Sequence, residues 1–264
     1  MTPFIEIRDV THVYGGAPGG SPAVQDLNLA VREGEFAAVV GPSGCGKSTL
    51  MKLATGLQFP RTGTTIVAGQ EVRAPVKLAG MAFQNPTMLP WRTTLENLLL
   101  PLEIVEPHRS RIRRRKGEYV EKAERLLAQV GLAGQGAKYP WELSGGMQQR
   151  ASLCRALIHE PKLLMLDEPF GALDAFTREE LWCVIRDLHA EQRFTVVLVT
   201  HDLREAVFLA DRIFCMSARP GRIVAEREVD IPRPRDLEVT YTPAFSEIVH
   251  ELRAHIAQAR MAAA

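Results

Sequence analysis

Apolar residues follow two different spacings along the chain, and each spacing predicts one kind of element. Short, nearly continuous apolar runs are typical of buried strands, whereas apolar residues three and four positions apart are typical of amphipathic helices. The short runs predict strands over 4–13, 23–31, 35–40, 63–67, 77–83, 163–166, 194–199, 212–216 and 222–231. The longer spacing predicts helices over 50–55, 94–100, 107–130, 147–159, 203–210 and 243–256, and one that begins at a Thr177/Glu180 capping box.

Strands alternate with helices over most of the chain, which is typical of an α/β fold with a mainly parallel sheet covered on both faces. A Gly/Pro-rich turn over 17–22 joins the first two strands and predicts a small antiparallel β layer at the N-terminus. The middle of the chain predicts an all-helical insert. We expect a single domain with these parts: an α/β core with its β layer over 1–88 and 160–231, a helical subdomain over 89–159, and a C-terminal extension with an amphipathic helix over 232–264.

The composition narrows the class of protein. With 264 residues, 46% apolar and 24% charged, the chain resembles a soluble globular protein, and its net charge of +1 gives no overall attraction to nucleic acid. No apolar run approaches the roughly 20 residues of a membrane span. Residues 1–8 alternate as a strand does and carry charges, so we expect no secretory signal. The cysteines have neither metal-ligand nor disulfide spacing and are expected to be reduced.

A glycine-rich segment lies between the predicted strand 35–40 and helix 50–55. It matches the pattern G-x-x-x-x-G-K-[ST] and consists of Gly41, Pro42, Ser43, Gly44, Cys45, Gly46, Lys47, Ser48 and Thr49. Glycines let backbone N–H groups turn toward a phosphate, and the helix N-terminus adds partial positive charge. We expect Lys47 to contact the β- and γ-phosphates and Ser48 to hold Mg²⁺. The alternative is a chance glycine turn, but the flanking elements favour a nucleoside triphosphate site.

Two acidic residues directly follow the predicted strand 163–166. Because ligands bind at the carboxyl ends of strands in open α/β sheets, we expect Asp167 to reach Mg²⁺ and Glu168 to deprotonate an attacking water. Alone, such a pair would more often be a solvated strand end. In a chain that also carries the glycine-rich segment, it predicts hydrolysis of the bound triphosphate.

A second anion-binding segment precedes the predicted helix 147–159. Ser144 is the expected N-cap, and Gly145 and Gly146 leave backbone N–H groups open to an anion. The alternative is a glycine-rich cap with nothing bound. The chain thus carries two candidate phosphate-binding segments.

Together these segments resemble the ATP-binding subunit of an ABC transporter over nearly the whole chain. Residues 41–49 are similar to the Walker A loop, 143–148 to the LSGGQ signature and 163–168 to Walker B. The remaining motifs occur in the family's order: an adenine-stacking Tyr14, a glutamine-loop Gln84, a D-loop over 172–174 and a switch His201. Met147 stands where the signature has its last Gln, and its side chain cannot hydrogen-bond a ribose.

The resemblance implies the fold of a P-loop NTPase and a set of site residues. It also implies a head-to-tail dimer that holds ATP between the Walker A loop of one copy and the signature loop of the other. The implied catalytic residues are Glu168, His201 and Gln84. The implied Mg²⁺ ligands are Ser48, Gln84 and Asp167. The residues implied to contact ATP across the dimer are Ser144, Gly145, Gly146 and Asp174. The alternatives are an ordinary strand-end aromatic for Tyr14 and a structural histidine for His201.

Residues 84–91, with Pro86 and Pro90, predict an exposed irregular loop. Its Leu-Pro-Trp resembles the nitrate/sulfonate/taurine branch of importers, which implies that Met88, Leu89 and Trp91 contact a membrane-spanning permease. The alternative is that Trp91 packs on the helical insert. The basic run from Arg109 to Lys116 is interpreted first as a solvated helix face, with contact to anionic lipid headgroups as the alternative.

The expected function is therefore that of the ATP-hydrolysing subunit of a bacterial importer for a small solute, with ATP and Mg²⁺ as cofactors. It would lie peripherally on the cytoplasmic face of the inner membrane, bind permease subunits and a second copy of itself, serve a periplasmic solute-binding protein indirectly, and bind no nucleic acid. Three alternatives are an ABC-type ATPase acting on nucleic acid or ribosomes, a regulatory module without turnover, and an exporter subunit. The chain would not touch the solute, so the sequence does not name it.

Overall fold

The computed structural model describes residues 3–15 and 21–261, so most of the turn predicted over 17–22 lies outside the described residues. The chain divides into two compact units. One consists of Met1–Val76 together with Leu188–Ala264, and the other of Lys77–Asp187. The second boundary falls inside the helix α6 (Ala175–Gln192).

The first unit contains the predicted antiparallel layer, in the strand order β2-β1-β4-β5. Its strands are β1 (Ile5–His12), β2 (Val24–Val31), β4 (Thr62–Val67) and β5 (Gln70–Glu71). Apolar residues of β1 and β2 alternate with polar ones, and the apolar ones other than Ala30 are buried, as expected for a sheet with one solvated face.

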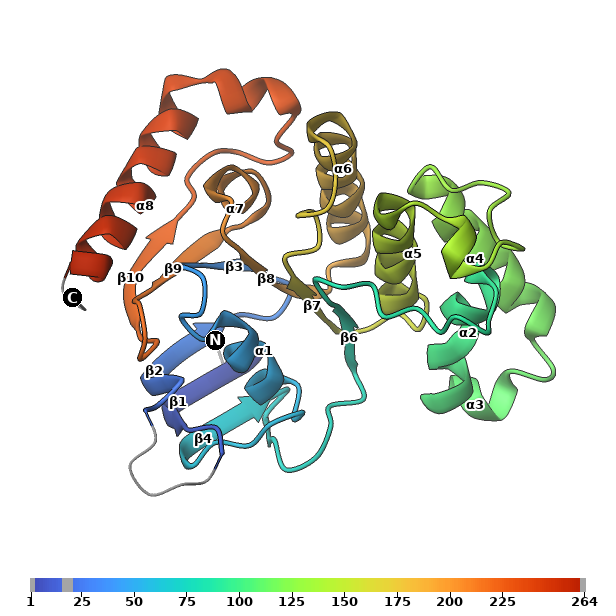
Figure 1. The fold of residues 1–264 in the computed structure, drawn as a ribbon, viewed down its shortest axis with the longest axis horizontal. Coiled ribbons are helices and arrows are strands. Elements are labelled where there is room, and N and C mark those ends of the chain that lie inside the picture. Colours follow the sequence, from blue (N-terminus) through green and yellow to red (C-terminus); the bar gives the residue numbers. More distant parts are fainter. Residues whose placement is uncertain (1–2, 16–20, 262–264) are drawn as a thin grey trace. The chain divides into compact units, whose positions relative to one another are not determined.

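The first unit also contains a mainly parallel group of strands, in the order β10-β9-β3-β8. β3 (Phe36–Val40) pairs in parallel with β8 (Thr195–Thr200) and β9 (Arg212–Met216), and β10 (Ile223–Glu228) pairs antiparallel with β9. Every residue of β3, β8 and β9 is buried, because both faces are covered. Figure 1 shows α7 (Leu203–Leu209) and α8 (Pro243–Met261) on one face, and α1 (Lys47–Ala54) with the antiparallel layer on the other.

The C-terminal extension is fastened to α7. The amphipathic helix α8 follows a short 3₁₀ turn (Leu237–Tyr241) and buries Phe245, Ile248 and Leu252. The buried guanidinium of Arg235 donates to the carbonyls of Val207, Phe208 and Ala210, at distances of 2.7–3.1 Å. These carbonyls end α7 and have no helical donor, so Arg235 serves as a C-cap from the extension. Burial lowers the pKa of Arg235 to about 10, which leaves it cationic at neutral pH.

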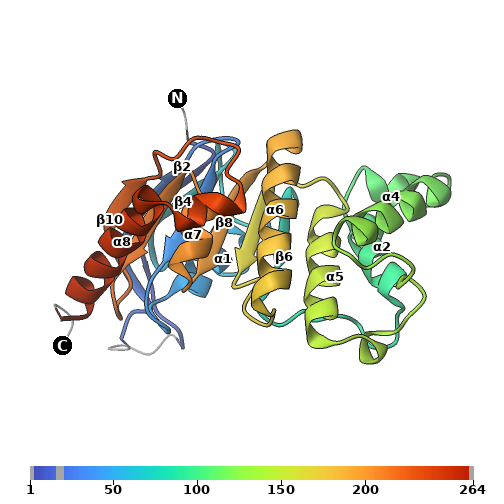
Figure 2. The same ribbon diagram turned by 90° about the horizontal axis from the view of Figure 1, so that it is seen from above.

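The second unit combines a parallel strand pair with helices. β6 (Ala79–Ala82) pairs with β7 (Leu163–Asp167). The helices are α2 (Thr94–Ile104), α3 (His108–Arg111), α4 (Lys116–Gln129), α5 (Gly145–Leu157) and a 3₁₀ turn (Pro140–Glu142), together with the first part of α6. Figure 2 shows α2, α4 and α5 grouped together, and their apolar faces bury Leu98, Tyr119, Ala123, Leu127 and Leu153.

Three predictions about helices were wrong in detail. α2 does not end before Pro101 but continues to Ile104, because Leu102 packs with 0% exposure and the amide of Val105 still bonds to the carbonyl of Pro101. The proline removes a single helical hydrogen bond, which this packing outweighs.

The helix predicted over 107–130 is two helices, α3 and α4, with residues 112–115 outside both. The arginine side chains of this run are exposed and supply no apolar stripe that would hold a helix against the insert.

The third error concerns α6. It begins at Ala175, and its first turn is capped by Asp174, whose Oδ1 accepts from the amide of Thr177 at 3.0 Å, so Thr177 is not the cap.

Candidate functional site

The predicted phosphate loop joins β3 to α1 in the first unit. Gly44 and Gly46 have φ values of 74° and 102°, a left-handed conformation that favours glycine. Gly46 is the N-cap of α1, so the helix begins at Lys47, earlier than the sequence suggested. The ammonium of Lys47 donates to the carbonyls of Gly41 at 2.9 Å and Pro42 at 3.0 Å. The positive charge is therefore held inside the loop, beside the amides of the first helical turn.

Tyr14 is tied to the helix that follows this loop. Its hydroxyl shares a hydrogen bond of 3.0 Å with Thr49 Oγ1, and its ring meets His12 edge-on at 4.9 Å. The side chain is 45% exposed. An aromatic side chain with exposed surface thus lies next to the phosphate loop.

His201 lies between the end of β8 and the start of α7, and its neighbours fix the backbone there. Thr200 donates to the buried carboxylate of Glu205 at 2.6 Å and accepts from the amide of Asp202 at 2.9 Å. Asp202 in turn caps α7 by accepting from the amides of Arg204 and Glu205. His201 is exposed, so the loop presents its imidazole on a rigid support at the strand end.

In the second unit, the structure brings Gln84 and Glu168 together. Asp167 ends β7, and Glu168 follows with a φ of 47°, a conformation that is strained for a residue with a side chain. The Gln84 amide Nε2 donates to Glu168 Oε2 at 3.2 Å. Backbone strain of this kind persists where the surroundings over-determine it, and it is common at catalytic positions.

The second anion-binding segment has the predicted cap. Ser144 Oγ accepts from the amide of Met147 at 3.3 Å, and α5 begins at Gly145, so both glycine amides belong to its first turn. Gly146 lies close to Leu173, because a Cβ on it would be 3.0 Å from Leu173 Cδ2. The signature-like segment and the segment ending in Asp174 are therefore neighbours. Hydrogen bonds from Thr177 lower the pKa of the Asp174 carboxyl, which keeps it charged.

Two side chains that the sequence analysis did not single out hold the loop over 84–93. Asn97 is 0% exposed, accepts from the amide of Leu89 at 2.7 Å and donates to the carbonyls of Leu89, Arg92 and Thr93 at 3.0–3.1 Å. Arg155, on α5, donates to the carbonyls of Pro86 and Thr87 at 2.8 and 3.0 Å. The sequence signal was a polar residue among leucines for Asn97 and an arginine in an otherwise apolar stretch of α5 for Arg155.

The exposed end of this loop carries Trp91. Its side chain is 71% exposed, so the alternative in which it packs on the helical insert is wrong. Met88 and Leu89 are half-buried. The next residue, Arg92, forms three hydrogen bonds of 2.9–3.0 Å with the carboxylate of Glu103 on α2.

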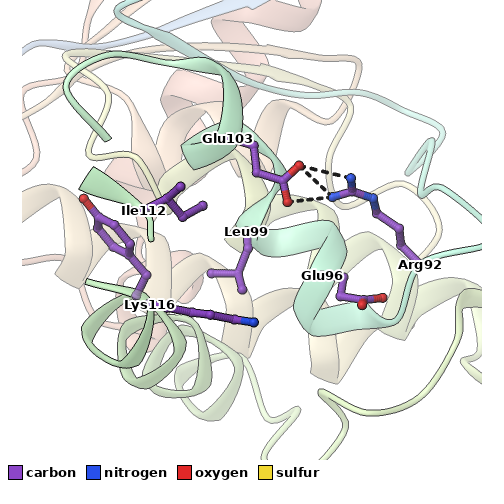
Figure 3. Close-up of a pocket in the computed structure, with 7 residues that line it drawn as sticks. Arg92, Glu96, Leu99, Glu103, Ile112 and Lys116 are labelled. Atoms are coloured by element: carbon purple, nitrogen blue, oxygen red, sulfur yellow. Dashed lines mark hydrogen bonds and ion pairs between the residues drawn. The ribbon is translucent and has the colours of Figure 1, made fainter. Parts of the chain in front are cut away.

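The Arg92–Glu103 pair faces a cavity of about 280 Å³ (Figure 3). Glu96, Leu99, Ile112, Lys116 and Tyr119 complete its lining. None of the predicted nucleotide residues lines this cavity, and it lies within the second unit.

Comparison with known proteins decides the family. Residues 24–171 match the family model described as ABC transporter. The chain belongs to the ABC transporter family. It is 44% identical to the aliphatic sulfonates import ATP-binding protein SsuB of Bacillus licheniformis, over 92% of this chain and 91% of that protein. It is 41% identical to the bicarbonate transport ATP-binding protein CmpD of Synechococcus elongatus, over 89% of this chain and 84% of that protein.

A solved structure is similar to most of this ABC protein. It is a dimeric post-hydrolysis state of the ATP-binding cassette MJ0796 bound to ADP and Pi, with a TM-score of 0.75 and 29% identity, covering 86% of this chain and 100% of that one. The predicted P-loop α/β fold, ATP binding and ATPase activity are confirmed, and the relatives support the importer prediction over its alternatives. Among the described residues, no helix is long and apolar enough to cross a membrane.

Proposed function

We propose that this ABC protein hydrolyses ATP to drive uptake of a small solute with an anionic group through separate permease subunits. One observation carries the proposal. A single segment begins at Gln84, whose amide contacts Glu168, and ends at the exposed Trp91, 71% of which is open to a partner. A change around Glu168 would thus reach a docking surface through the backbone of one anchored loop.

Each site residue has a role in this reaction that follows from its chemistry. Glu168 deprotonates and orients the attacking water, and Gln84 holds the Glu168 carboxylate in place. Lys47 and His201 stabilise the charge that develops on the transferring phosphoryl group. Tyr14 stacks on the adenine, and the amides of residues 41–49 bind the phosphates.

The donors available for Mg²⁺ are a hydroxyl, an amide and a carboxylate: Ser48, Gln84 and Asp167. These are hard oxygen ligands of the kind Mg²⁺ prefers, and their small number leaves room for phosphate oxygens and water. Among the described residues no three His, Cys, Asp or Glu side chains gather, which fits a metal held largely by the nucleotide. When bound, Mg²⁺ neutralises charge on the β- and γ-phosphates.

The second anion-binding segment requires a second copy of the chain. In a head-to-tail dimer, Ser144, Gly145, Gly146 and Asp174 of one copy would close over ATP held by the other, and the similar solved structure is a dimer. Met147 fits this role because its amide, not its side chain, makes the capping bond to Ser144. In functional terms we assign 1–88 and 160–231 to the nucleotide core, 89–159 to the signature-bearing insert and 232–264 to the extension.

The loop around Trp91 is suited to hold a short helix of the permease. Asn97 fastens its backbone, and the Arg92–Glu103 pair (Figure 3) ties the loop to α2, so docking would order few additional side chains. Met88, Leu89 and Trp91 then supply apolar contact area. The protein would lie peripherally on the cytoplasmic face of a bacterial inner membrane.

The names of the relatives point to the solute class. One relative is named for aliphatic sulfonates and the other for bicarbonate. Together with the Leu-Pro-Trp of residues 89–91, these names support a small solute with an anionic group, of the nitrate, sulfonate or taurine type. A periplasmic binding protein and the permease would select it. This chain contacts the solute only through them.

The test is ATP hydrolysis by the chain reconstituted with its permease and binding protein in vesicles. Aliphatic sulfonate or nitrate should stimulate hydrolysis, and Glu168→Gln should lower the rate by about 100- to 10,000-fold while ATP binding persists. The exposed Glu191→Gln is the control and should match the wild type. Hydrolysis that neither solute stimulates would contradict the proposed solute class, and wild-type turnover by Glu168→Gln would contradict the base assignment.

A further inference from the structure

Gly221 lies in the turn between β9 and β10, and its backbone packs directly on the phosphate loop. A Cβ placed on Gly221 would lie 2.0 Å from the carbonyl oxygen of Cys45, in the middle of that loop, and 2.6 Å from Met216 Cε. No side chain is tolerated at such a distance from a backbone oxygen. The methionine end can rotate away, but the carbonyl can move only if the loop moves.

The turn is itself held in place by backbone hydrogen bonds to the start of β2. The amide of Gly221 donates to the carbonyl of Ala23 at 3.1 Å, and its carbonyl accepts from the amide of Gln25 at 3.0 Å. Ser217 closes the turn, because its hydroxyl donates to the carbonyl of Pro220 and accepts from the amide of Arg222, both at 3.0 Å.

The phosphate loop is confined on further sides. A Cβ on Gly46 would lie 2.8 Å from the carbonyl oxygen of Ala23 and 2.6 Å from Val24 Cγ1. A Cβ on Gly41 would lie 2.9 Å from the carbonyl oxygen of Met216, at the end of β9. Gly41, Cys45 and Gly46 of the loop thus pack closely against β9, the Gly221 turn and the start of β2.

We propose that Gly221 is a positioning residue for the nucleotide, acting through the carbonyl of Cys45. The proposal rests on ATP binding by residues 41–49. Because Gly221 has no Cβ, the turn can pack against the phosphate loop without displacing it. The loop then keeps the conformation in which its amides point at one phosphate. Any side chain at 221 displaces the Cys45 carbonyl by at least about 1 Å. Misplacement of that size in a preorganised site lowers its activity by on the order of 100-fold.

The experiment measures Mg²⁺–ATP and Mg²⁺–ADP affinity of Gly221→Ala by titration calorimetry on the full chain. Affinity for both nucleotides should fall by about 10- to 100-fold, while the circular dichroism of the free protein is unchanged. Gly117→Ala is the matched control, because a Cβ there meets nothing within 4 Å, and it should bind as the wild type does. Wild-type affinity in Gly221→Ala would overturn the proposal.

A second variant decides the question if Gly221→Ala does not fold. Ser217→Ala removes the two hydrogen bonds that close the turn without adding any atom. We expect a smaller loss of nucleotide affinity, and wild-type affinity in this variant would then overturn the proposal. If the wild type itself bound no ATP, the assignment of residues 41–49 would fail instead.

Discussion

Replacing Asn97 by alanine should release the Trp91 loop from the helical insert. The side chain makes four hydrogen bonds to the segment over 89–93, one accepted from the Leu89 amide and three donated to carbonyls. It is 0% exposed, so these hydrogen bonds are shielded from water in the wild type. The loop would keep its connection to α2 through the Arg92–Glu103 pair and the Thr93–Glu96 capping box.

The magnitude follows from these bonds. Each internal hydrogen bond contributes about 0.5–1.5 kcal/mol net, and the loop carbonyls can recover part of this from solvent, so we expect a loss of about 2–4 kcal/mol. For a chain of this size that corresponds to a fall in Tm of roughly 4 to 16 °C. Asn97→Asp keeps the acceptor for the Leu89 amide but places a buried carboxylate oxygen against three carbonyl oxygens, so it should destabilise the chain at least as much as the alanine variant.

The assays are thermal unfolding and hydrogen exchange of the peptide that contains 86–93. The Leu89 amide should lose protection in Asn97→Ala, and capture of the chain by detergent-solubilised permease should weaken. Gln129→Ala, which removes an exposed amide at the end of α4, is the control and should leave all three measurements unchanged. Wild-type exchange at Leu89 in Asn97→Ala would refute the reasoning, because the loop would then be held by something else.

Two further predictions concern the nucleotide residues. Lys47→Ala removes the ammonium held within the phosphate loop and should weaken ATP binding by about 10- to 100-fold in an equilibrium titration, as expected for lost charged hydrogen bonds; unchanged affinity would count against the loop assignment. Hydrogen bonds from Thr177 lower the pKa of the Asp174 carboxyl in the folded state. The ionised carboxylate therefore stabilises the fold at pH values above the unfolded-state pKa, and this stabilisation is lost as the pH falls through the folded-state pKa. Below about pH 4, the Tm of the wild type should therefore fall more steeply than that of Asp174→Asn, which keeps the cap without titrating; parallel curves would show that the charge on Asp174 adds nothing to stability.

Local patterns predicted most elements because they depend on neighbouring residues. The apolar runs correctly located the strands β3, β7, β8 and β9, because a strand buried on both faces is marked by continuous apolar residues. The Ser144 cap was also correct, because its bond closes within one turn. The errors at Pro101 and Asp174 arose where two local rules competed, and packing or the better acceptor decided between them.

The sequence by itself determined the family, the order of the motifs and the chemistry each side chain can perform, because these depend on residue type and spacing. Only the tertiary structure decided what holds those side chains in place. Arg155 holds a loop by donating to the carbonyl of Thr87, 68 positions away along the chain. Gly221 meets Cys45 across 176 positions, which is visible only once β9 and β10 are folded against the phosphate loop. A contact of that kind is made between backbone atoms, which are the same in every residue, so the residue types in the sequence do not indicate it.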